Sequence, residues 1–165
     1  MSDIEETIEK ESFDRNKLVL EIGVRTAKLN SLSGIDFIND VLDFIENIGY
    51  TLLNSDVFGI SFSIINAEDY FTSKCNRNDV PAALYSYALQ YVAGDFLSKK
   101  LASGNLEIGT LDLSSAILTS IEMGDVKESF DKSSSDRTAL DSALQYFRNA
   151  AEKEGVLKCH TKVRF

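Results

Sequence analysis

The residues best able to do chemistry in this sequence are its single histidine and its two cysteines. His160 follows Cys159, and a cysteine beside a histidine could form a nucleophile with its base. Adjacent residues on an extended segment point to opposite sides, so these two side chains are poorly placed for that task. Cys75 lies far from Cys159, without the spacing of zinc ligands. We therefore expect reduced thiols, no metal site and no cofactor.

Paired acids are the remaining candidates for acid–base work or cation binding. Glu68 and Asp69 are adjacent, and such pairs on helices usually belong to the solvated face. Glu5, Glu6 and Glu9 faintly resemble the carboxylates of a metal-dependent nucleotide hydrolase, but no second carboxylate helix matches them. The chain has no phosphate-binding glycine motif and no serine nucleophile elbow. The sequence supports no catalytic mechanism, and we expect that the protein is not an enzyme.

The composition indicates one folded domain with an acidic surface. The chain has 165 residues, of which 44% are hydrophobic and 26% are charged, and its net charge is −9. This charge argues against wrapping nucleic acid, because such binding neutralises phosphates with Lys and Arg. An acidic wall would instead let DNA slide past. The N-terminus lacks the apolar region of a signal peptide, and DVFGISFSII is too short to cross a bilayer. We expect a soluble protein, made in the cytoplasm, with no membrane partner.

Hydrophobic spacing predicts a mainly α fold, a small bundle of about four to five helices. Apolar residues recur at helical spacing on one side of each segment, and acids or serines precede several of them as caps. Asp36, Asp56 and Asp79 are the predicted caps of the first three helices, while Gly104 and Gly155 are predicted stops. The predicted helical segments are 34–54, 56–76, 76–104, 110–121 and 136–154.

Two regions depart from this pattern. Between residues 17 and 29 apolar residues alternate as in a strand but also share a helix face, so both alternatives stay open. Gly124 and Asp125 form a turn pair, and the alternation from Val126 to Phe130 predicts a short β-hairpin or strand insertion. We expect extended terminal arms around the bundle. The predicted divisions are an N-terminal arm at 1–34, partly disordered or strand, a helical domain at 35–155, and a basic tail at 156–165.

The end of the chain, GVLKCHTKVRF, reverses the charge of the rest. Its formal charges are Lys158, Lys162 and Arg164, all positive, and Phe165 closes it. Cations on such an arm can steer it toward a partner, and burial of Val163 or Phe165 would contribute roughly 1.5–3 kcal/mol for each side chain. The pattern favours a segment that another protein holds.

The order of motifs resembles the head–tail connector proteins of tailed bacteriophages, also called adaptor or head completion proteins. The resemblance rests on CNRNDVPAAL (75–84), SIEMGDVKESF (120–130) and KVRF (162–165), and it covers roughly the last two-thirds of the chain. The N-terminal third has no clear match. Family tails often carry more Arg and end in Trp, whereas the residues at 159–161 dilute the charge here.

This resemblance implies a mainly helical, non-enzymatic structural protein of the virion, located in the neck at the head–tail interface. Family members form a homo-oligomeric ring, typically a dodecamer, beneath the portal protein. The ring extends the DNA channel without sequence-specific binding and receives a stopper or tail-completion protein. The C-terminal segment is the part expected to reach into the portal.

Two sets of residues are the candidate contacts. The portal-binding set is Lys158, His160, Lys162, Val163, Arg164 and Phe165. The set for the ring or another partner, where a strand could pair with a neighbour's edge, is Gly124, Asp125, Val126 and Phe130.

The alternative function is that of a cytoplasmic helical regulator or adaptor without catalytic activity. Such a protein would account equally well for the acidity, the small size and the missing catalytic motifs. It would not account for the ordered motifs or for the basic end with its aromatic residue.

Overall fold

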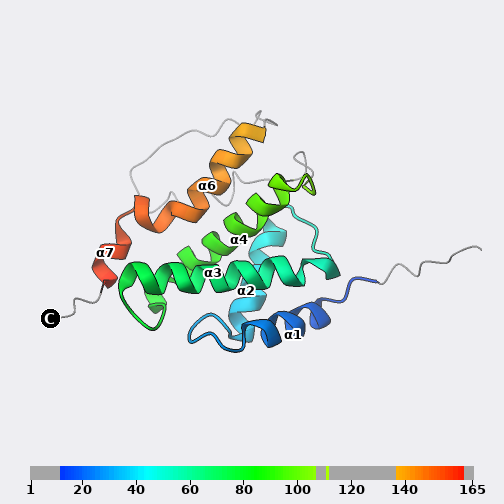
Figure 1. Cartoon of the computed structure of the whole chain (residues 1–165). Helices are drawn as coiled ribbons and strands as arrows, with labels where there is room; N and C mark the ends of the chain where they lie inside the picture. The colour runs from blue at the N-terminus through cyan, green and yellow to red at the C-terminus, as the bar shows by residue number, and fades with distance from the viewer. Residues whose placement is uncertain (1–11, 107–110, 112–136, 162–165) are drawn as a thin grey trace, which may run out of the picture.

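Apolar residues at helical spacing produce a bundle of α-helices, seen in the computed structural model in Figure 1. The structure describes residues 12–106, 111 and 137–161. The mainly α fold is confirmed. No strand occurs in these described residues, and the predicted hairpin at 124–130 lies outside them. The helices are α1 (Arg15–Thr26), α2 (Ile35–Asn47), α3 (Val57–Cys75), α4 (Tyr85–Ala102), α6 (Arg137–Lys153) and α7 (Val156–His160).

The described part of the N-terminal region belongs to the core. Asp14 caps α1 by accepting the backbone N–H groups of Asn16 and Lys17, at 2.9 and 3.2 Å. Leu18 and Ile22 on α1 are buried, and α1 packs against α2 and α3. The helical alternative for this segment is therefore the correct one. For residues 12–34 the expectation of an arm is wrong, because the apolar face of α1 fills part of the core.

Helix α4 lies at the centre of the bundle, between α3 and α6, and packs most extensively against α6 (Figure 1). Gly94 makes that close approach possible. A Cβ at this position would lie 2.8 Å from the carbonyl oxygen of Leu144 and 3.0 Å from the Cβ of Phe147. The side of α4 that faces the bundle carries Ala88, Val92 and Phe96, which are buried like Leu84 just before the helix, and Asp95 is buried among them.

Several helix ends differ from the predicted caps. Gly34 rather than Asp36 is the N-cap of α2, and Asp36 lies in the first turn. Asp79 pairs with Arg77 at 3.0 Å, and a 3₁₀ turn over Ala82–Leu84 precedes α4. Proline cannot donate a backbone hydrogen bond, so Pro81 suits this irregular entry. Gly104 and Gly155 have φ values of 74° and 71°, and they end α4 and α6 as predicted.

A buried glutamate fixes the loop between α1 and α2. The carboxylate of Glu68 on α3 accepts three consecutive backbone N–H groups, from Asn30, Ser31 and Leu32, at 2.6, 2.9 and 2.8 Å. The hydroxyl of Ser31 in turn accepts the N–H of Val80 at 2.9 Å. The interpretation of Glu68 as part of a solvated pair is wrong, although its neighbour Asp69 is exposed. Glu68 thus joins α3, the α1–α2 loop and the approach to α4.

Replacing this carboxylate should loosen the loop more than the fold around it. Glu68→Gln removes the charge from three hydrogen bonds and leaves at least one buried N–H poorly matched, so we expect a loss of about 2 kcal/mol in unfolding free energy. Urea denaturation followed by circular dichroism measures this loss. Amide exchange should accelerate at Asn30, Ser31 and Leu32.

The adjacent exposed acid provides a matched control for that change. Asp69→Asn makes the same chemical substitution on the same helix and should stay within about 0.5 kcal/mol of the unsubstituted protein. Equal losses for the two variants would show that the three hydrogen bonds to Glu68 do not stabilise the loop.

Candidate functional site

The described part of the basic C-terminal segment is a helix. The chain turns at Gly155 after α6 and continues as α7, which packs against α3 and α6. Leu157 faces the core with 6% of its surface exposed, and the hydroxyl of Thr161 donates to the carbonyl of Leu157 at 2.9 Å. The expectation of an extended tail is therefore wrong for residues 156–160. Burial of Leu157 holds this part against the bundle.

The structure places only part of the predicted portal-binding set. Lys158 is exposed and His160 is half-buried, and both lie in the last turn of α7. Cations are favoured there by the partial negative charge of a helix C-terminus. The rest of this set, Lys162, Val163, Arg164 and Phe165, lies outside the described residues, as does the complete set at Gly124, Asp125, Val126 and Phe130.

Two acids at the end of α6 attach it to its neighbours. Glu152 forms an ion pair with Lys74 at the end of α3. Glu154 accepts a hydrogen bond from the hydroxyl of Tyr87 on α4 and another from Tyr146 at 3.3 Å. These contacts join three helices immediately before α7 begins. The residues immediately before the basic segment are therefore held in place by contacts with α3 and α4.

The same acids change the chemistry of the tyrosines beside them. Burial, followed by the hydrogen bond and the charge of Glu154, raises the pKa of Tyr87 to about 12. Burial, followed by the charge of Glu152, raises the pKa of Tyr70 to about 12. Both phenols are hence neutral at physiological pH, where Tyr87 acts as a hydrogen-bond donor to Glu154.

A buried charge pair joins the start of α3 to the end of α4. The carboxylate of Asp56 lies 2.5 Å from the ammonium of Lys100 and accepts hydrogen bonds from the hydroxyl of Tyr50 at 3.0 Å and the N–H of Leu53 at 2.9 Å. Burial opposes the charge on Lys100, but the hydrogen bond and charge of Asp56 raise its pKa. A carboxylate with this many partners is a structural group rather than a free acid or base.

A second buried carboxylate lies where α3, α4 and α6 meet. Asp95 pairs with Lys99, accepts a hydrogen bond from the side-chain amide of Asn66 at 3.2 Å, and lies 3.8 Å from the Nε of Arg148. The inward position of Asp95 follows from helical spacing. The identity of its partners could not be predicted in this way, because Asn66 and Arg148 come from helices distant in the sequence.

The other residues considered for chemistry are not grouped in the described structure. Cys75 is a buried free thiol, and burial raises its pKa. Within the described residues no three His, Cys, Asp or Glu side chains are close enough to hold a metal ion. Glu5, Glu6 and Glu9 lie outside this part of the chain. No helix in the described ranges combines the length and apolar character needed to cross a membrane.

In comparisons with known proteins, no family model, curated protein sequence or solved structure matches this chain. The residues, their charges and their positions in the bundle must therefore carry any functional proposal.

The Tyr87–Glu154 contact can be tested by titration. Glu154→Gln removes the negative charge beside the phenol, so the pKa of Tyr87 should fall from about 12 toward its ordinary value of 10. Tyr85 is the internal control, because burial and a hydrogen bond to Asp40 raise its pKa to about 12 independently of Glu154. Residue-resolved NMR titration of the tyrosine rings measures both values.

The pH dependence of stability gives a second measurement of the same contact. The pKa of Tyr87 is higher in the folded than in the unfolded state, so its contribution is complete below pH 10 and is lost as the pH rises toward 12. Glu154→Gln should make this loss smaller. An unchanged pKa of Tyr87 in the variant would show that Glu154 does not anchor the end of α6 to α4.

Proposed function

We propose that this chain is a non-catalytic structural protein of a tailed-bacteriophage virion, a connector that assembles as a ring between the portal and the stopper or tail-completion protein. The single observation that carries the proposal is a basic C-terminal element fixed to an acidic helical body. The net charge is −9, whereas the last ten residues contain Lys158, Lys162 and Arg164 and no acid. Binding of a partner through this element would explain why the sequence changes from acidic to basic at its end, since packing of the core does not require that change.

The position of α7 supports this use of the C-terminal segment. Leu157 and the contacts of Glu152 and Glu154 hold the start of the segment, while Lys158 stays exposed. Residues 156–160 would then bind in the conformation that α7 already has, which lowers the entropic cost of binding. In a ring, many copies of one modest contact would add through avidity.

The acidic body supports the proposed position around passing DNA. A surface with excess carboxylates repels phosphates and does not retain nucleic acid by counterion release. The proposed interaction with DNA is therefore passage through the ring rather than binding.

Quantitative mass spectrometry of DNA-filled virions from the source phage tests the location. We expect this chain and the portal protein in near-equal amounts, since each would form one ring at the same vertex. Absence of the chain from purified particles would refute the connector proposal. The cytoplasmic regulator without catalytic activity would then be the better proposal.

Charge reversal tests the contact itself. Lys158→Glu, Lys162→Glu and Arg164→Glu together should abolish binding to the portal. The three glutamates would face a portal surface that is complementary to positive charge, and like charges would repel. Cosedimentation with assembled portal measures binding, and circular dichroism checks that the variant is folded.

The matched control reverses three exposed cations elsewhere on the bundle, as Lys17→Glu, Lys28→Glu and Lys153→Glu. It changes the net charge by the same amount and should leave cosedimentation intact. Equal loss in both triple variants would show that overall charge, and not the C-terminal element, determines docking.

A further inference from the structure

Two phenylalanines form an exposed aromatic pair on α3. Phe58 and Phe62 are one helical turn apart, and 66% and 46% of their surfaces are exposed. Their rings stack with a centroid separation of 6.1 Å and an interplanar angle of 7°. Single exposed apolar residues are ordinary on protein surfaces, but adjoining ones mark a surface that something covers.

Positive charge borders this aromatic pair. The guanidinium of Arg25 on α1 lies 5.9 Å from the centre of the Phe58 ring. The ammonium of Lys99 on α4 lies 4.6 Å from the centre of the Phe62 ring. The chain is strongly acidic overall, and Lys99 also pairs with Asp95. Two cations from different helices over neighbouring rings still make this surface more basic than the rest, which favours an acidic partner.

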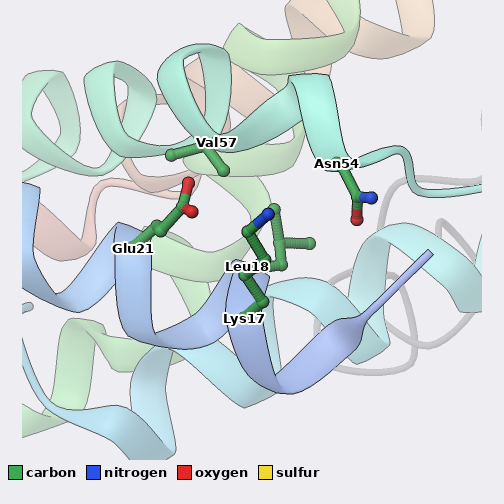
Figure 2. A pocket seen from close by; sticks show the side chains of 5 residues that line it. All are labelled: Lys17, Leu18, Glu21, Asn54 and Val57. Carbon is green, nitrogen blue, oxygen red and sulfur yellow. The ribbon is translucent and has the colours of Figure 1, made fainter. Parts of the chain in front are cut away.

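A shallow groove lies between α1 and the start of α3. It has a volume of ≈ 130 Å³. Figure 2 shows the side chains from α1 on one side of it, and Asn54 before α3 and Val57 at its start on the other. Val57 lines the groove and directly precedes Phe58 on α3. Its lining residues are Lys17, Leu18, Glu21, Asn54 and Val57.

The described chain begins at this groove. The carbonyl of Ser12 accepts a hydrogen bond from the side chain of Asn54 at 3.2 Å, and the N–H of Asp14 donates to the same side chain at 3.2 Å. Residues 1–11 therefore connect to the bundle beside Asn54, in the 3₁₀ turn over Asn54–Asp56 that precedes α3. From Asn54 to Phe62 these helical turns rise about 13 Å, and eleven residues span about 16 Å even when helical. The segment is long enough to cover the pair.

The composition of residues 1–11 matches the surface. The segment MSDIEETIEKE has five acids and one lysine. Its branched apolar residues, Ile4 and Ile8, are four apart and would share one side of a helix. Apolar anchors at this spacing, flanked by acids, are a usual form of a helical segment that lays one side on an apolar surface with basic residues at its edge.

We propose that residues 1–11 fold back onto their own chain and cover the aromatic pair. Ile4 and Ile8 contact the rings of Phe58 and Phe62, and the acids of the segment lie beside Arg25 and Lys99. This inference does not depend on the connector function. The contact would keep an exposed aromatic surface from associating with other copies.

Tryptophan fluorescence provides a direct test, because the chain has no tryptophan. Phe58→Trp in the full-length chain places one fluorophore in the proposed contact. Adding Ile4→Asp and Ile8→Asp should lower the ratio of docked to free segment more than about tenfold. Acrylamide quenching should then rise to the level of an exposed tryptophan, and the emission maximum should shift to longer wavelength.

Two controls isolate the apolar contact from charge and from general quenching. Ser2→Asp with Thr7→Asp adds the same charge but keeps both isoleucines, and it should leave the quenching of Phe58→Trp low. Ile35→Trp, at an exposed position beyond the far end of α1, should quench equally with and without the isoleucine changes. Circular dichroism confirms that each variant is folded.

The outcomes separate the possible contacts. Low quenching that rises with the isoleucine changes and does not depend on protein concentration supports the intramolecular contact. Equal quenching with and without Ile4→Asp and Ile8→Asp would overturn it. Protection that disappears on dilution would also overturn it, because the segment would then be covering a second copy.

Discussion

The carboxylate of Glu68 is the contact on which the arrangement of the N-terminal helices depends. It binds three successive backbone N–H groups of the α1–α2 loop, and Ser31 of that loop holds the backbone of Val80 before α4. One buried charge thereby fixes where α1 ends, where α2 begins and how the chain approaches α4. Backbone N–H groups in a packed loop require hydrogen-bond acceptors, and these three do not bond to the backbone carbonyls of a helix or strand. Glu68 provides them from α3.

The other buried carboxylates also join helices through their partners, at different junctions of the bundle. Asp56 joins the start of α3 to the end of α4 through Lys100, and Asp95 lies between α3, α4 and α6 with Lys99 and Arg148. Each carboxylate meets a cation or a set of donors, which offsets the cost of removing it from water. Where Gly94 brings α4 and α6 into contact, the neighbouring Asp95–Arg148 pair restricts how the two helices align.

The sequence predicted the helices whose apolar residues follow one period and missed what depends on tertiary contacts. The apolar residues at helical spacing from Ile38 to Ile48 are buried and Gly155 ends α6 as predicted, because both features rest on local spacing and backbone conformation. Ile35, in contrast, is exposed, and the helix predicted over 34–54 ends at Asn47. The segment of α1 fits two periods, and only packing against α2 and α3 decides between them. Glu68 could not be separated from exposed Asp69, because its partners are backbone groups more than 35 residues away. Helix α7 could likewise not be predicted, because it depends on burial of Leu157 against the bundle, which a segment of five apolar and five polar residues does not indicate.

Helical structure at the start of the basic segment changes how that segment could bind. On a free arm, every residue from 156 onward would lose conformational freedom on docking, at about 1–2 kcal/mol for each backbone. With α7 packed on α3 and α6, the cost for residues 156–160, half of this segment, is already met by folding. Lys162 to Phe165 then begin one residue from Thr161, within about 14 Å of a fixed point even when extended. A short reach from a rigid base favours a partner surface close to the bundle. In the proposed ring, the C-terminal contact would therefore set the distance between connector and portal as well as their attraction.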